Sequence, residues 1–396
     1  MKFLQIGDLH LGKKLYEFSL YDDQVFMLEK IIEILQKDNF DALLITGDIY
    51  EQSMPSQDAI NLFGGFLEKI HATLPELSVF IISGNHDSSA RLSYASEILK
   101  TQNIFIQTNF DETSEPIIFK AGDEECAIFM LPFLQQSVSK KTKANLSQVE
   151  IITEAALYLK EKLKTSMPNI LLAHLFTLPE NKNSKVEKFS ENENDNMIID
   201  EYRGSVQFVS PSVFNFFDYV ALGHLHSFLK ITDRMYYSGS PFAYSFDEVK
   251  TNEYEKFALA VEINCNEKDS LPNVNKIKIP QLHRLQILSG EFSEFISTDK
   301  FNSYAKDYLQ IELINSNAVE SAMQLLQKKF PLTMHIKQKS FEVLSSNKKN
   351  NFIVEKIISE NDFENIFKMF IRDIGEETND EEINLAKTFW EMEDKE

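Results

Sequence analysis

The sequence predicts an α/β domain with sheets flanked by helices, followed by a small α+β module and a C-terminal helical tail. Over the first 100 residues, short apolar runs alternate with stretches of helical periodicity, which is typical of βαβ units. Polar segments rich in Asn and Ser then divide the rest of the chain. A chain of 396 residues with 43% apolar and 26% charged residues supports two or three folded domains and excludes wholesale disorder.

The first domain is predicted from its order of strands and helices. Buried strands are expected at 2–7, 41–46 and 78–83, because these runs are almost wholly apolar. Apolar residues at spacings of three and four predict helices at 22–38 and 56–70. The same criteria predict a helix at 147–164 and strands at 126–131, 169–174, 219–224, 235–239 and 257–263. We therefore place one α/β domain at residues 1–265.

Two polar linkers, at 264–275 and 345–351, set off the later parts of the chain. Between them the pattern predicts a small α+β module at 275–343, with the strand-like HRLQILSG, strands at 308–314 and 333–337, and helices near 291–298 and 318–329. After the second linker, amphipathic segments predict helices at 362–373 and 380–392. These form a tail at 352–396 that is too small for a core of its own.

Charge and composition exclude several classes of protein. The 61 acidic and 40 basic residues leave a net charge of −21, which argues against a chain held on nucleic acid by a general basic field. No apolar run approaches the ~18 residues of a membrane span, and the N-terminus has no secretory cleavage pattern. Cys126 and Cys265 lie too far apart in sequence for a thiolate metal motif. We expect a soluble cytoplasmic protein.

Metal-binding side chains recur where the predicted strands end. Because the carboxyl ends of strands in an α/β sheet form the usual ligand site, and residues i and i+2 of an extended segment point the same way, these groups should converge. The glycines before three of them are consistent with a crowded backbone. A single His on a strand is usually a packing residue, but here seven donors follow five segments: Asp8, His10, Asp48, Asn85, His174, His224 and His226.

Seven ligands are too many for one ion and predict two. Two cations about 3.5–4 Å apart need a bridging carboxylate, and Asp48 is the natural candidate. Carboxylate, amide and imidazole donors without sulfur suit Mn²⁺, Fe²⁺ or Zn²⁺ in a phosphoesterase. The chemistry implied is attack of activated water on a phosphoryl centre. His71, His283 and His335 lack this context and are interpreted as surface or packing residues.

The segments DLH, GDIY, GNHD, the lone His174 and GHLH resemble the five motifs of the calcineurin-like metallophosphoesterases. The longer runs YVALGHLHSF and YYSGSPFAYSFDE are similar to the SbcD family, the nuclease subunits of SbcCD complexes. The resemblance implies a four-layer sandwich with a capping, DNA-binding module. It also implies that Asp8, His10, Asp48 and His226 hold one Mn²⁺, and Asp48, Asn85, His174 and His224 the other.

The same resemblance implies the activity and the partners. His86 would be the catalytic histidine that assists protonation of the leaving oxygen. Asp87 would orient His86 or nearby backbone, or serve as a capping or packing residue. The activities implied are ATP-dependent 3′-5′ exonuclease action on duplex DNA and endonuclease cutting of single strands and hairpins, in DNA repair, recombination and replication. By the same resemblance, ATP would act only through an SbcC-type SMC-like ATPase bound by the tail, and the nuclease would form a homodimer within a heterotetramer.

Several points stay open. Lys13 and Lys14, or the run Lys140, Lys141 and Lys143, could contact DNA phosphates or simply be solvated. The segment after His174 is longer and richer in Asn, Glu and Lys than the family pattern. Rival functions are a phosphodiesterase acting on a small molecule or nucleotide, and a non-catalytic interaction scaffold. A dimer surface or a core face is predicted for Ile60, Phe63, Leu67 and Ile70.

Overall fold

The computed structural model describes residues 1–110, 115–134, 146–179, 208–249, 255–267, 270–314, 319 and 321–338. The loop at 180–196, the basic run at 140–143, the linker at 345–351 and the predicted tail helices lie outside these residues. Within the described ranges, no helix has the length and apolar character needed to cross a membrane.

The first sheet carries the predicted βαβ units. Strands β1 (Lys2–Ile6), β4 (Ala42–Ile45), β5 (Ser78–Ile82) and β6 (Ile104–Gln107) run parallel, and β13 (Phe257–Glu262) and β14 (Asn273–Lys278) add antiparallel strands, in the order β14-β13-β1-β4-β5-β6. Helices α1 (Tyr21–Lys37) and α2 (Gln57–Thr73) cross over between its parallel strands. The predicted strands and helices of this region are confirmed to within a few residues.

The second sheet has the order β11-β12-β10-β9-β8-β7. Its strands are β7 (Ile117–Ala121), β8 (Glu124–Leu131), β9 (Asn169–His174), β10 (Tyr219–Gly223), β11 (Leu229–Thr232) and β12 (Met235–Tyr237). Helix α5 (Gln148–Glu161) begins at a capping box, in which the Ser147 side chain and Glu150 satisfy each other's backbone N–H groups.

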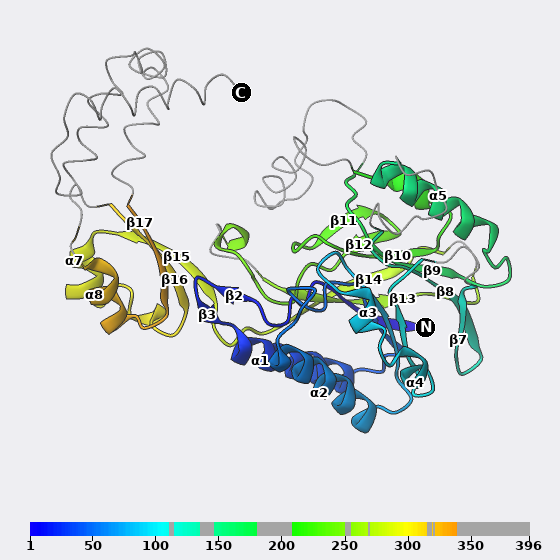
Figure 1. The fold of residues 1–396 in the computed structure, drawn as a ribbon, viewed down its shortest axis with the longest axis horizontal. Helices are drawn as coiled ribbons and strands as arrows, with labels where there is room; N and C mark the ends of the chain where they lie inside the picture. The colour runs from blue at the N-terminus through cyan, green and yellow to red at the C-terminus, as the bar shows by residue number, and fades with distance from the viewer. Residues whose placement is uncertain are drawn as a thin grey trace, which may run out of the picture. The chain divides into compact units, whose positions relative to one another are not determined.

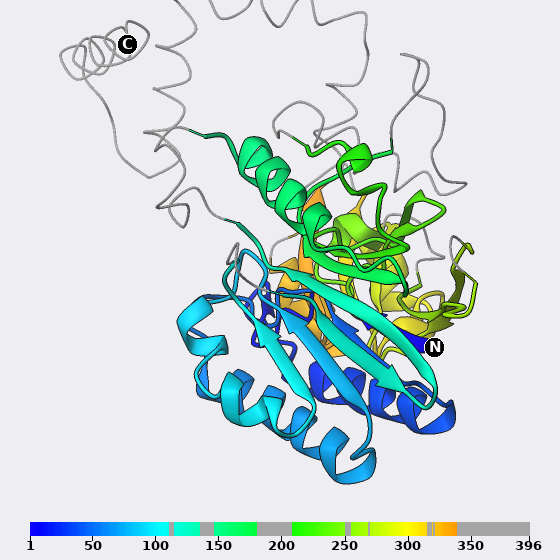
Figure 2. The same cartoon turned by 90° about the vertical axis from the view of Figure 1, so that its right-hand side faces the viewer.

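Three apolar clusters bind these elements into four layers, as the fold class predicted. One cluster joins α1 and α2 to the first sheet through residues such as Ile31, Phe63 and Ile81. A second lies between the two sheets and includes Phe80 and Tyr219. The third joins the second sheet to α5. Helices α1 and α2 lie on one outer side and α5 on the other, with the strands between them (Figures 1 and 2).

Several strands of the structure were not predicted from the sequence. Strand β14, NVNKIK, is mostly exposed and pairs with β13 through its backbone, so the predicted linker at 264–275 ends within a strand. The two-residue strands β2 (Lys14–Leu15) and β3 (Phe18–Ser19) form a hairpin too short to show periodicity, and β6, β7 and β11 were also missed. Pairing between backbones needs no apolar pattern when one face of a strand meets water.

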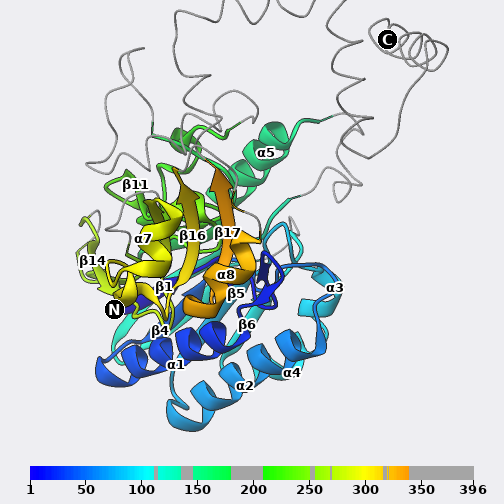
Figure 3. The same cartoon turned by 90° about the vertical axis from the view of Figure 1, so that its left-hand side faces the viewer.

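The later module contains a three-stranded sheet in the order β15-β16-β17. Figure 3 shows it with its helices. The elements are β15 (Leu285–Gly290), α7 (Phe292–Ser297), β16 (Tyr308–Leu313), α8 (Ala322–Lys329) and β17 (Thr333–Gln338), close to prediction.

One compact unit comprises Met1–Leu288, Phe301–Gln310 and Leu326–His335, and a second comprises Ser289–Lys300, Ile311–Leu325 and Ile336–Glu396. The functional domain boundaries given above stay predictions.

Candidate metal centre

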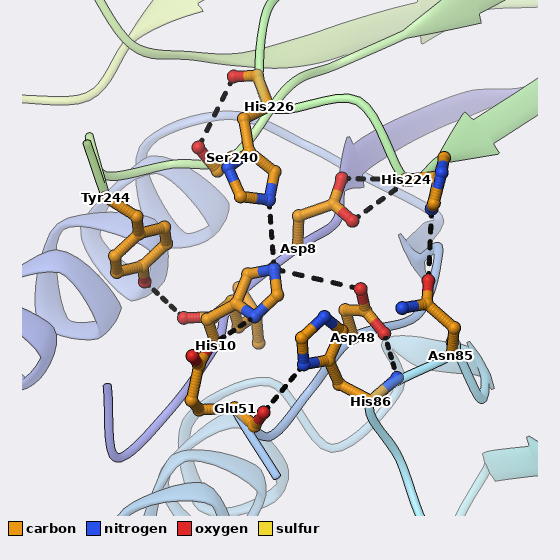
Figure 4. Close-up of polar contacts among 12 residues, drawn as sticks. Asp8, His10, Asp48, Glu51, Asn85, His86, His224, His226, Ser240 and Tyr244 are labelled. Atoms are coloured by element: carbon orange, nitrogen blue, oxygen red, sulfur yellow. Dashed lines mark hydrogen bonds and ion pairs between the residues drawn. The ribbon is translucent and has the colours of Figure 1, made fainter. Parts of the chain in front are cut away.

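The predicted site residues lie at the carboxyl ends of strands or in the loops that follow, but these strands belong to two sheets. Asp8 and His10 follow β1, Asp48 follows β4, and Asn85 and His86 follow β5, all in the first sheet. His174 ends β9, and His224 and His226 follow β10, both in the second sheet. Figure 4 shows side chains from both sheets turned toward one another. The cluster therefore forms where the strand ends of the two sheets meet.

The backbone of this site is not extended, contrary to our expectation. Asp8, His10, Asp48 and His224 have φ values of 54°, 44°, 49° and 114°, in a region that residues with a Cβ rarely adopt. The expectation that residues i and i+2 point the same way here is therefore wrong. The His224 ring contacts Asn85, whereas the His226 ring contacts His10. Such backbone strain concentrates at functional sites, where the surrounding structure holds it in place.

Glycine is required where these loops touch, as predicted. A Cβ added to Gly84 would lie 2.1 Å from Asp48 Oδ1, and one added to Gly223 would lie 2.0 Å from the Thr46 carbonyl oxygen. Both distances are far below van der Waals contact. A larger residue at Gly84 would push apart two loops of the first sheet, and one at Gly223 would push the second sheet away from the first.

The donor atoms form two groups that share Asp48. In the first group, His10 Nε2 faces His226 Nε2 at 3.0 Å and lies 3.7 Å from Asp48 Oδ2. In the second, Asn85 Oδ1 lies 3.0 Å from both His174 Nε2 and His224 Nδ1, and His174 Nε2 is 3.5 Å from Asp48 Oδ2. Both groups contain residues of the predicted ligand sets, and Asp48 lies between them. Asp8, predicted for the ion of His10 and His226, instead accepts the His224 N–H and offers a ligand atom near Asp48 and His174. The assignment of ligands to ions stays a prediction.

The electrostatics of the cluster fit divalent cations. Asp8 is fully buried, and burial together with the nearby charge of Asp48 raises its pKa well above the ordinary value. Burial lowers the pKa of His174, and lowers that of His224 to about 3, so their ring nitrogens stay neutral and able to ligate. Asp8, Asp48 and His174 each offer a ligand atom within 4.8 Å of one another. Buried carboxylates beside neutral imidazoles form a donor set suited to cations.

His86 is held by two hydrogen bonds. Its backbone N–H donates to Asp48 Oδ1 at 2.9 Å, and its ring Nδ1 lies 2.7 Å from the carbonyl oxygen of Glu51. Its ring also meets that of His10 edge-on, with centroids 4.8 Å apart. His10, Asp48 and His86 offer ligand atoms within 4.8 Å of one another. The Glu51 bond makes Nδ1 the donor and leaves Nε2 for ligation or proton transfer.

Glu51 is a site residue that the sequence analysis missed. Its carboxylate lies 2.9 Å from His10 Nδ1 and 2.8 Å from Lys13 Nζ. Burial raises the pKa of Glu51, but the bonds from His10 and Lys13 outweigh this and lower it to about 2. The available signal was an acidic residue three positions after Asp48. Lys13, a candidate DNA contact, is thus paired within the site, whereas Lys14 is exposed on β2.

Asp87 ties two loops together through their backbones. Its Oδ2 accepts N–H bonds from Ile49 at 3.1 Å and Gly84 at 2.8 Å, and its Oδ1 accepts one from Tyr50 at 3.0 Å. The expectation that Asp87 orients nearby backbone is confirmed, because these bonds link the Asp48 loop to the Asn85 loop.

The remaining three histidines have contacts outside the cluster or are exposed. His71 is exposed on α2, His283 is bonded to Asp23, and His335 stacks on Tyr16 with ring centroids 4.8 Å apart. Their interpretation as surface or packing residues is confirmed.

A comparison with protein families identifies the class of the chain. The model of the calcineurin-like phosphoesterases matches residues 1–228, which include every residue of the cluster. The chain belongs to this family. The family hydrolyses phosphoesters with metal ions, so the fold and the candidate metal-binding residues agree with a metal-dependent hydrolase.

The solved structures that match this chain include a nucleotidase, a phosphatase and a nuclease, all at low identity. A Staphylococcus aureus protein assigned as a 5′-nucleotidase is 11% identical, with a TM-score of 0.37, over 70% of this chain and 54% of its own. A dimetal phosphatase from Danio rerio is 11% identical, with a TM-score of 0.37, over 71% and 99%. The nuclease MPE of Pseudomonas putida is 16% identical, with a TM-score of 0.21, over 44% and 64%. This chain thus spans about half the length of the Staphylococcus aureus protein.

Proposed function

We propose that this phosphoesterase is the nuclease subunit of an SbcCD-type complex and hydrolyses DNA phosphodiesters with two Mn²⁺ ions. The observation that carries the proposal is the pair of donor groups that share Asp48. Neighbouring donor atoms lie 3.0 Å apart within each group. The run YVALGHLHSF and the segment YYSGSPFAYSFDE support the nuclease assignment within the family. The reactions proposed are ATP-dependent 3′-5′ exonuclease action on duplex ends and endonuclease cutting of single strands and hairpins.

The residues of the site have distinct roles in this proposal. The two ions, when bound, supply a nucleophilic water and offset the charge of the phosphate. His86 gives a proton to the leaving oxygen from Nε2, because its Nδ1–H is held by the Glu51 carbonyl oxygen. Asp87 keeps the His86 loop against the Asp48 loop, and so keeps the acid in place beside the donor groups.

Cleavage by the pure chain tests the function. With Mn²⁺, the protein is expected to cut plasmid and hairpin DNA, and Asp48→Asn is expected to remove this activity. His71→Ala, which alters an exposed histidine outside the site, is the matched control and keeps full activity. If only bis-p-nitrophenyl phosphate is hydrolysed, the function is instead that of a phosphodiesterase for small molecules or nucleotides. If no metal binds and nothing is hydrolysed, the protein is an interaction scaffold.

The proposed partners are DNA and an SbcC-type SMC-like ATPase. A chain with a net charge of −21 repels DNA at long range, so a basic partner surface would provide much of the binding. Of the two lysines after His10, Lys14 on β2 is the exposed candidate for a phosphate contact. The tail at 352–396, proposed as the ATPase contact, lies outside the described residues.

A homodimer is also proposed, through a surface other than the apolar face first considered. Phe63 is only 4% exposed and packs against Tyr50 and Phe66, so it belongs to the core. In contrast, Tyr94 is 90% and Ile98 72% exposed. Light scattering is expected to give a dimer for the wild type and a folded monomer for Tyr94→Glu. A Tyr94→Glu protein that stays dimeric would exclude this surface.

A further inference from the structure

The segment YYSGSPFAYSFDE (236–248) supplies none of the proposed metal ligands, yet it packs against two of them. The backbone N–H of Ser240 donates to the His226 carbonyl oxygen at 3.0 Å. The Tyr244 hydroxyl donates to the Leu9 carbonyl oxygen, between two ligands, and its ring lies 5.4 Å from that of His10. Figure 4 shows Ser240 and Tyr244 beside these histidines. The segment therefore contacts the proposed ligands, and its role in the site is not explained by metal ligation.

A buried ion pair stands behind this segment. Lys256 Nζ lies 2.5 Å from Glu248 Oε2, and the two side chains are only 6% and 8% exposed. Lys256 Nζ also donates to the His226 carbonyl oxygen at 2.9 Å and to Ser240 Oγ at 3.1 Å. Glu248 Oε1 accepts the Tyr244 N–H at 3.0 Å and lies 3.3 Å from His226 Nδ1. One residue thus holds the His226 backbone and the other its ring.

The contact with Glu248 decides which nitrogen of His226 carries the proton. A carboxylate only accepts hydrogen bonds, so His226 Nδ1 must be the protonated nitrogen. Nε2 then keeps its lone pair, and this is the atom that faces His10 Nε2 at 3.0 Å within the first donor group. A carboxylate also lies behind His10, since Glu51 Oε2 is 2.9 Å from its Nδ1. Carboxylates behind metal-binding histidines orient the ring and raise its basicity.

Stability alone does not account for such a pair. Removing two charges from water costs free energy that a buried ion pair barely recovers, so apolar residues of similar size are often as stabilising. We propose that Glu248 and Lys256 form a positioning pair, which fixes the tautomer and orientation of His226 and thereby sets the metal affinity of the first donor group. This inference rests on the proposed two-metal function.

Mn²⁺ titration calorimetry without DNA tests the proposal. Wild type is expected to bind two ions. Glu248→Gln keeps the shape of the side chain, but its amide can either donate a hydrogen bond to His226 Nδ1 or accept one from it. The His226 tautomer is then no longer fixed, so we expect the affinity for one of the two ions to fall 10–100-fold. The Glu248→Gln/Lys256→Met double variant leaves no buried charge unpaired and should fold, yet keep the same loss. The control is Lys230→Met/Asp233→Asn, at an ion pair with side chains 51% and 66% exposed, and should bind like wild type.

The outcomes separate this inference from the proposed function. A folded double variant that binds both ions with wild-type affinity would show that the pair is only structural. In the metal-free wild type, ¹⁵N NMR should find His226 protonated at Nδ1, and protonation at Nε2 would overturn the proposal even if every variant failed to fold. A wild-type chain that binds no Mn²⁺ would instead refute the two-metal function itself.

Discussion

Replacing Asp87 by Asn tests how the loops of the metal centre are held together. The Asp87 carboxylate is buried and accepts N–H bonds from Ile49, Tyr50 and Gly84. Burial, with the charge of Asp48, raises its pKa to about 6 from an ordinary 3.8, although the three N–H bonds oppose the change. Asn has nearly the same shape but does not ionise, so the substitution isolates the titration of this one group.

The magnitude follows from the two pKa values. Because the folded pKa lies above the unfolded one, the stability that the protonated group provides is fully present below about pH 4 and is lost as the pH rises through 6. A pKa difference of about 2 corresponds to about 3 kcal/mol in the free energy of unfolding. About 2 kcal/mol of this falls between pH 4.5 and 7.5, since the unfolded carboxyl group already titrates below pH 4.5.

The assay is urea unfolding followed by circular dichroism in EDTA, at pH 4.5 and 7.5. Over this range, wild type should lose about 2 kcal/mol more stability than Asp87→Asn. The control is Asp58→Asn, on the exposed first turn of α2. Its free energy of unfolding should change with pH as that of wild type does, to within about 0.5 kcal/mol. If the difference between wild type and Asp87→Asn does not change with pH, Asp87 does not hold a buried charge between the two loops.

Three further predictions concern the centre and the tail. Asp48→Asn should lose both ions by elemental analysis, and a variant that keeps one ion at normal affinity would contradict a shared ligand. His86→Asn should keep two ions but lose about 10²-fold in rate, as expected of an acid, whereas loss of metal would make His86 a ligand. Deleting 352–396 should leave Mn²⁺-dependent cleavage of single strands and remove co-purification with the ATPase. A truncated chain that still captures the ATPase at full strength would exclude the tail as the contact.

The sequence predicted the elements whose signal is local. Strands such as β1 and β5 are continuous apolar runs, because both of their faces are buried. Helices α1 and α2 have apolar residues at helical spacing, because one face of each packs on a sheet. Strand β14 has neither signal, since it is mostly exposed and is held by backbone bonds to β13.

The chemical identity of the candidate site was also readable from the sequence, because its donors directly follow buried strands. The supporting residues were not, since they are defined by contacts between distant segments. Glu51 is known as a partner only because His10 lies beside it, and Lys256 only because it reaches the His226 carbonyl oxygen 30 residues away in sequence.

The residue types at the strand ends, and hence the class of chemistry, were set by the sequence alone. The tertiary structure decided that those ends belong to two sheets, with Asp48 from the first lying between histidines of the first and the second. It also decided the left-handed backbone at Asp8 and His224. The physical reason is that periodicity reports which face of an element is buried, whereas the meeting of two sheets depends on packing among residues far apart in the chain.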